Sequence, residues 1–162
     1  MAAPPRELRV TVGEIAGTLR GIHKCLIDLA SGAYEREHGP LGSPFVLFRL
    51  LTTDPRFAWL RPLTELTAAI DELLDRPAAI ARRDGEAVRA ELEDLLGATE
   101  GERGQFRETY LEILQADPDV VIEHGRLMTQ VRELPSLEPT ERAELLRVRH
   151  GWSPPRTRRT AN

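Results

Sequence analysis

The sequence has little cysteine and no long apolar run. Cys25 is the one cysteine among 162 residues, so the chain cannot close an internal disulfide, a pattern that favours the reducing cytoplasm. No apolar segment approaches the roughly 20 residues that a membrane-spanning helix needs. The first ten residues lack the apolar centre of a signal peptide. We therefore expect a cytoplasmic protein without a membrane contact.

Aromatic residues are also sparse, at 5% of the chain, while 41% of residues are hydrophobic and 30% are charged. Domains rich in β-strands normally use more aromatic and β-branched residues, so this composition favours helices. A chain of this length can bury a substantial core within one domain. The composition therefore predicts a single all-α domain.

The motifs of several enzyme classes are missing as well. The chain shows no glycine-rich phosphate loop, no Ser-His-Asp arrangement and no zinc-ligand spacing. His23 and Cys25 are two positions apart, which places them about 200° apart around a helix, so they are poorly placed to act as a base and a nucleophile. We expect a protein that is not an enzyme, and no catalytic residue is assigned.

What the chain does have is a heptad-like apolar pattern near its start. Apolar residues recur at alternating steps of three and four, at positions 12, 15, 19, 22, 26, 29 and 33. Thr11 and Glu14 form a capping-box pattern, and Gly39 followed by Pro40 is a typical helix stop. This predicts one long helix from Thr11 to about His38.

Three serine–proline or aspartate–proline pairs predict further helix starts. They are Ser43-Pro44, Asp54-Pro55 and Asp117-Pro118. The apolar segment after Ser43 is expected to be buried, and Pro62 is expected either to kink its helix or to begin a new one. Other apolar patterns predict helices near 63–75, 78–96, 102–116 and 139–149, with a possible break at Asp84-Gly85. The expected fold is a mostly antiparallel bundle of five to seven helices over residues 11–149, after a lead-in at 1–10.

Charge is distributed unevenly along the chain. Residues 147–162 hold five of the 22 basic residues and no acidic one, which leaves 17 basic and 26 acidic residues, a net charge of −9, in residues 1–146. The composition of residues 150–162 predicts a disordered basic tail that contacts either an acidic surface or nucleic acid. Trp152 either anchors such a contact or packs on the domain.

Two histidines, His23 and His124, lie on or beside apolar helix faces. A hydrogen-bonded core role is the simpler interpretation, and a shared polar site is the alternative. The chain has a distant, fold-level likeness to hemerythrin-like bundles, but such metal sites use several inward ligands, and the sequence has a single Glu-x-x-His match, Glu35 to His38. No cofactor is favoured. A metal or haem bound by these residues belongs to the alternative hypothesis.

The segment "DPRFAWLRPL" carries the second candidate site. In one interpretation, its aromatic residues fill a junction in the core, and Arg61 pairs with an acid or with exposed carbonyls. In the other, Trp59 lines a pocket in which the planar guanidinium of Arg61 holds an anion.

Gly13, Gly17 and Gly21 recur every four residues along the first predicted helix. They are either glycines that the helix tolerates or a strip where a second chain makes contact.

The segments "SPF", "DPRFAWLRPL" and "YLEILQADPDVV" resemble those of a family of small uncharacterised bacterial proteins. The resemblance spans about residues 20–130. It implies a helical fold and no particular activity. The preferred hypothesis is a non-enzymatic cytoplasmic binding or interaction module, which would associate as a homodimer or with another protein. The alternative is a bundle, either a binding protein or an enzyme, that binds a small molecule or metal near His23 and His124.

Overall fold

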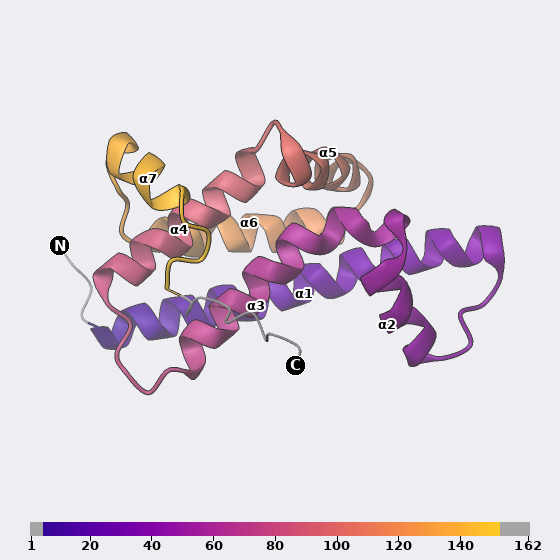
Figure 1. Ribbon diagram of the computed structural model, residues 1–162, viewed down its shortest axis with the longest axis horizontal. Helices are drawn as coiled ribbons and strands as arrows, with labels where there is room; N and C mark the ends of the chain where they lie inside the picture. The colour runs from indigo at the N-terminus through magenta and orange to yellow at the C-terminus, as the bar shows by residue number, and fades with distance from the viewer. Residues whose placement is uncertain (1–4, 153–162) are drawn as a thin grey trace, which may run out of the picture.

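The structure, a computed structural model, describes residues 5–152 as a helical bundle, and the predicted all-α fold is confirmed (Figure 1). Helix α1 runs along the length of the molecule and packs mainly against α6 and α3, while α2 lies at one end (Figure 1). The elements are α1 (Pro5–His38), α2 (Pro44–Thr53), the 3-10 helix η1 (Pro55–Leu60), α3 (Arg61–Asp75), α4 (Arg82–Gly97), α5 (Gly101–Ala116), α6 (Pro118–Glu133) and α7 (Pro139–Leu146). Within the described residues, no helix is both long and apolar enough to cross a bilayer.

Helix α1 begins earlier than the sequence pattern predicted. Its 34 residues start at Pro5, so the expected start at Thr11 and the non-helical lead-in are wrong for residues 5–10. Leu8 is buried one helical turn before Val12 and thereby extends the apolar seam toward the N-terminus. The predicted end is confirmed, because α1 stops at His38 and Gly39 adopts a left-handed φ of 82°.

Each proline-marked helix start is confirmed by its cap. The side-chain oxygens of Ser43, Asp54 and Asp117 each accept a hydrogen bond from a backbone N–H in the first turn that follows. Pro62 does not kink a helix. It lies in the first turn of α3, where the missing N–H of proline costs no hydrogen bond. Asp84 and Gly85 likewise do not break α4, because the Asp84 carboxylate accepts from the N–H of Ala81 and so caps the helix.

Helix α2 is not buried, contrary to the prediction from its apolar sequence. Its main packing partner is η1, so only one side of the helix is covered. Leu50 faces the core, whereas Phe45 and Phe48 are 72% and 64% exposed. The sequence of α2 is apolar on two sides. Because α2 lies at the end of the bundle, one of these sides is exposed.

Arginine side chains complete the ends of three helices. The last turn of a helix leaves carbonyl groups without intrahelical partners. Arg9 on α1 donates to the carbonyls of Leu74 and Arg76 at the end of α3, at 2.6 and 2.8 Å. Arg89 on α4 reaches the carbonyl of Leu134 after α6, and Arg107 on α5 reaches the carbonyl of Leu96 in α4. These contacts tie neighbouring helices together as well as satisfying the carbonyls.

The described residues after α7 pack on the bundle. Helix α7 ends at Leu146 rather than near Arg149, and Trp152 is buried, with its indole N–H donating to the carbonyl of Ala69 on α3 at 2.8 Å. The predicted tail is therefore wrong for residues 150–152, because an indole ring and a paired histidine give this segment something to bury. The rest of that predicted tail, residues 153–162, lies outside the described residues.

The glycines of α1 and α5 make a matched test of local packing. A Cβ atom at Gly17 would meet nothing within 4 Å, whereas one at Gly104 would lie 2.8 Å from the backbone carbon of Thr99. Gly17→Ala should stabilise the fold by up to about 1 kcal/mol, because alanine is the better helix former. Gly104→Ala should destabilise it by about 1–3 kcal/mol, because the backbone of Thr99 must move. Urea unfolding of both variants checks the opposite signs, and a stabilised Gly104→Ala would contradict the packing described.

Candidate ligand-binding cavity

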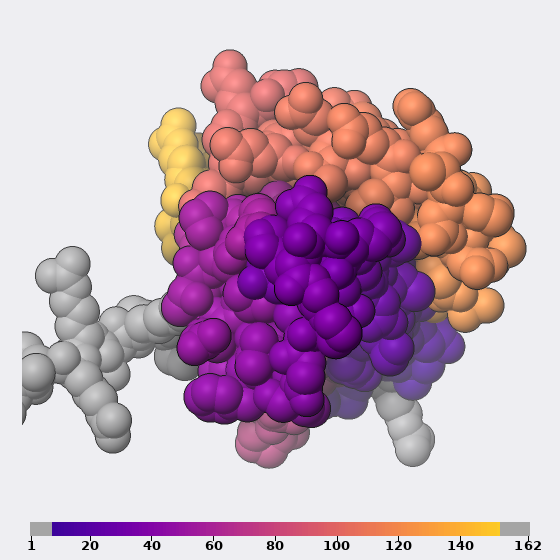
Figure 2. Space-filling view, turned by 90° about the vertical axis from the view of Figure 1, so that its right-hand side faces the viewer, coloured from indigo at the N-terminus to yellow at the C-terminus, as the bar shows by residue number. Residues whose placement is uncertain are grey.

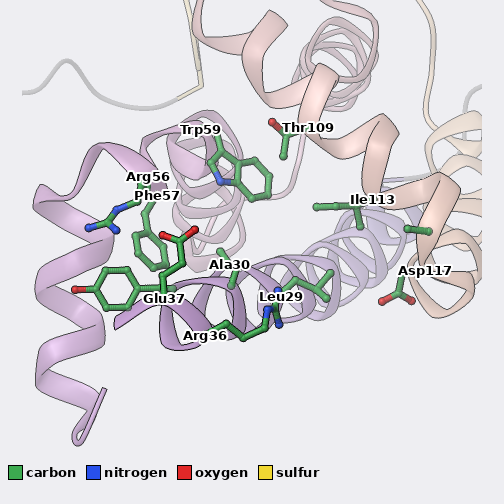
Figure 3. Close-up of a pocket in the computed structure, with 13 residues that line it drawn as sticks. Leu29, Ala30, Arg36, Glu37, Arg56, Phe57, Trp59, Thr109, Ile113 and Asp117 are labelled. Atoms are coloured by element: carbon green, nitrogen blue, oxygen red, sulfur yellow. The ribbon is translucent and has the colours of Figure 1, made fainter. Parts of the chain in front are cut away.

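An open cavity of about 470 Å³ lies between the C-terminal half of α1, η1 and the second half of α5 (Figure 3). Figure 2 looks onto this end of the molecule, where the purple segments of α1 and α2 lie beside the orange segments of α5 and α6. The volume is in the range of small-molecule sites, which are concave and mostly apolar. The walls come from α1 (Leu29, Ala30, Ala33, Tyr34, Arg36, Glu37), η1 (Arg56, Phe57, Trp59), α5 (Thr109, Ile113, Ala116) and the linker residue Asp117.

The floor of the cavity is the last part of the α1 apolar seam. The first five predicted seam positions, from Val12 to Leu26, are fully buried in the bundle. The last two, Leu29 and Ala33, are exposed and line the cavity instead. A seam that continues past its packing partners leaves an apolar surface that a ligand can cover.

Aromatic residues of η1 form one wall. Phe57 is buried under the wall, and the half-buried Trp59 stacks on Phe106 of α5 with ring centroids 6.2 Å apart. Phe106 in turn stacks on Tyr110, which fixes the orientation of the indole. The pocket interpretation predicted that Trp59 lines a cavity, and the structure places it there.

Arg56, not Arg61, is the arginine that the "DPRFAWLRPL" segment brings to this cavity. A 3-10 helix has three residues per turn, so residues three apart lie on the same side, and Arg56 and Trp59 of η1 satisfy this spacing. Arg61 begins α3 and forms an exposed ion pair with Glu102 at 3.2 Å. The pairing of Arg61 with an acid, expected in the junction interpretation, is therefore confirmed, and Arg61 does not line the cavity. Exposed pairs of this kind contribute little to stability.

The charge of Arg56 is already paired. Its Nε and Nη2 atoms donate to the two carboxylate oxygens of Asp54, at 3.0 and 2.9 Å. Its guanidinium carbon lies 4.6 Å from the centre of the Tyr34 ring, and Nη1 lies 2.9 Å from Nε2 of His38. The hydrogen bonds from Arg56 lower the pKa of Asp54, so the carboxylate stays ionised and the pair persists at neutral pH.

The two candidate histidines contact different helices and are not brought to one site. His23 on α1 lies 2.9 Å from the hydroxyl of Thr64 on α3. That hydroxyl donates its hydrogen to the carbonyl of Leu60, so Nε2–H of His23 is the donor to Thr64. His124 on α6 has Nδ1 at 3.0 Å from the hydroxyl of Tyr110. Burial lowers the pKa of both histidines, so both rings are neutral at pH 7.

The metal candidates do not assemble either. Glu35 accepts a hydrogen bond from the N–H of Leu41 and so supports the turn after α1. His38 stacks on Tyr34, with ring centroids 4.4 Å apart. Within residues 5–152, no three His, Cys, Asp or Glu side chains lie close enough together to hold a metal ion. The geometry therefore gives no support to the metal or haem alternative at these positions.

A buried charge cluster was missed by the sequence analysis. Glu91 of α4 is fully buried, and Oε2 lies 3.2 Å from Nη2 of Arg103 and 2.8 Å from Nδ1 of His150, the latter without hydrogen-bond alignment. The other oxygen of Glu91 accepts from the backbone N–H of His150. The sequence did place this glutamate between the core positions Val88 and Leu95, which indicated a buried charge. Its partners Arg103 and His150, however, lie 12 and 59 residues away, so a local pattern could not identify them.

No protein-family model, curated protein or solved structure matches the chain. The resemblance to small bacterial proteins drawn from the "DPRFAWLRPL" segment therefore stays a prediction.

Proposed function

We propose that this protein is a non-enzymatic binding module whose ligand is a small apolar molecule held in the cavity between α1, η1 and α5. One observation carries the proposal: Leu29 and Ala33 continue the core seam of α1 but are exposed, and they form the floor beneath the Trp59 wall. The cavity lining contains no Cys, Ser or His, so it offers shape and apolar surface rather than a nucleophile beside a base. The cytoplasmic location expected from the sequence belongs to the same proposal.

A neutral apolar probe tests the proposal directly. Titration with n-octanol, followed by calorimetry and by tryptophan fluorescence, should give saturable binding and a change in Trp59 emission. Ala33→Phe should abolish binding, because the new ring occupies the floor of the cavity. Ala68→Phe is the matched control, since Ala68 is also an exposed helical alanine and does not line the cavity. Binding that survives in Ala33→Phe, or is absent in the wild type, would overturn the proposal.

A second candidate function is self-association, as the sequence analysis expected of an interaction module. It is favoured by the outward rings of Phe45 and Phe48 on α2, since exposed apolar surfaces often mark protein contacts. The glycine strip offers another surface, because no Cβ contact lies within 4 Å of Gly13, Gly17 or Gly21. Light scattering should then show a dimer. If α2 forms the contact, the double variant Phe45→Ser, Phe48→Ser should dissociate it. If the glycine strip forms the contact, Gly17→Leu should dissociate it. A monomeric wild type at high concentration would exclude both.

A further inference from the structure

We propose that the ligand of this cavity is an amphipathic cation, a small molecule with an apolar chain and one ammonium group. This inference rests on the proposed binding function and specifies its ligand class. The apolar part would lie on Leu29, Ala33 and Ile113, and the cationic group would lie at the mouth, between Trp59 and Glu37. Two observations support it. One is how the charged residues that line the cavity are paired, and the other is the indole face that Trp59 presents to the cavity. The charged residues are Arg36, Glu37, Arg56 and Asp117.

The positive charges at the mouth are not directed to a ligand. Arg56 has both carboxylate oxygens of Asp54 as partners, so an anionic ligand would have to compete with a bidentate ion pair. Arg36 folds back along α1, with Nη1 3.6 Å from the Cβ position of Gly32 (Figure 3). Arg36 therefore lies away from the Trp59 ring, where the polar end of the ligand is placed (Figure 3).

The negative charges at the mouth are less compensated. Glu37 is 73% exposed, and its carboxylate lies 3.9 Å from the Nδ1 atom of His38. In the view of Figure 3 this carboxylate projects over the space beside Phe57 and Trp59. Asp117 lies across the cavity and uses Oδ1 to cap α6. The net charge of −4 over the whole chain adds a weak general attraction for cations.

The aromatic wall fits a cation as well. One face of the Trp59 ring packs on Phe106, which leaves the indole to present its other side to the cavity. Tryptophan is the strongest cation–π partner among the aromatic side chains. The neighbouring ring of Tyr34 already carries the guanidinium of Arg56 at 4.6 Å, so a cation against an aromatic face is stable in this environment.

Three probes of one chain length separate the class of ligand from binding itself. Calorimetry would compare n-octyltrimethylammonium, n-octanol and n-octyl sulfate, each below its micelle concentration, against the wild type and Glu37→Gln. The cation should bind most tightly and the sulfate most weakly. Glu37→Gln should weaken the cation about fivefold, the effect of one charge at about 4 Å in a solvent-exposed site, and change octanol less than twofold. The preference should also decrease as salt is raised.

The possible failures are distinct. If octanol binds as tightly as the ammonium compound, or if octyl sulfate binds best, the inference about charge is wrong while the proposed binding function stands. If Glu37→Gln leaves the cation affinity unchanged, the assignment of Glu37 is wrong. If none of the three probes binds, both the inference and the proposed function are wrong. Because Glu37 is exposed, its replacement by glutamine should leave the fold intact, and a melting curve checks this.

Discussion

Trp152→Ala should lower the free energy of unfolding by about 3–5 kcal/mol, the cost of removing a large aromatic side chain from a core. Trp152 is 5% exposed and lies against α3, far from its own position in sequence. The substitution removes this buried ring together with the hydrogen bond to the Ala69 carbonyl. Chemical denaturation of the purified variant measures the loss.

Trp152→Phe is the matched control. Phenylalanine keeps most of the buried apolar surface but cannot donate to Ala69, so the loss should be about 1–2 kcal/mol. The Ala69 carbonyl remains part of α3, so it is not left without a partner when the indole is removed. An alanine variant within about 1 kcal/mol of the wild type would show that the last described turn is not part of the core in solution.

Glu91→Gln should cost about 3 kcal/mol, because it removes the negative charge from a buried cluster and leaves Asp94 as the one carboxylate paired with Arg103. The carboxylate also holds the backbone of His150, whose φ of 53° lies in the left-handed region that non-glycine residues seldom adopt. Glu93→Gln is the control on the same helix. Glu93 pairs with Arg89 near the surface, so its replacement should cost less than about 1 kcal/mol.

The contribution of Glu91 should depend on pH. Burial by itself raises the pKa of this carboxyl, but the backbone N–H and the nearby ring of His150, together with the charge of Arg103, outweigh burial, and the pKa is lowered below its usual 4.5. A carboxyl with a lowered folded-state pKa stabilises the fold above the unfolded pKa, and this stability is lost as pH falls through the folded value. The difference between wild type and Glu91→Gln should therefore be full at pH 7 and shrink below about pH 4.5. A difference that stays constant down to pH 3 would contradict the ionised assignment of Glu91.

The candidate site shows how far local patterns reach. One interpretation of the "DPRFAWLRPL" segment had Trp59 line a cavity, which it does, and the other had its aromatic residues fill the core, which holds for Phe57. Arg61 pairs with an acid, as one interpretation expected, whereas the other interpretation placed Arg61 rather than Arg56 in the cavity, because the sequence does not reveal that the segment before Pro62 is a 3-10 helix. The change from 3.6 to three residues per turn brings Arg56 to the side of Trp59. Tyr34 and Glu37 were missed because they come from the distant end of α1.

The sequence by itself determined the helices and most of their boundaries. Heptad spacing, serine or aspartate caps, proline in the first turn and glycine at the end of α1 act within one or two turns of chain, so they can be read locally. It also indicated which face of α1 is apolar.

Only the tertiary structure decided how much of each apolar face is covered. Leu29 and Ala33 continue the same seam as Val12, and yet they line a cavity, because the neighbouring helices do not extend over them. Phe45 likewise stays exposed, because no other helix in the described residues covers that side of α2, whereas Trp152 is buried because it packs against α3. Burial depends on which elements pack against each other. Glu91 and His150, for example, are in contact although they are 59 positions apart in the sequence.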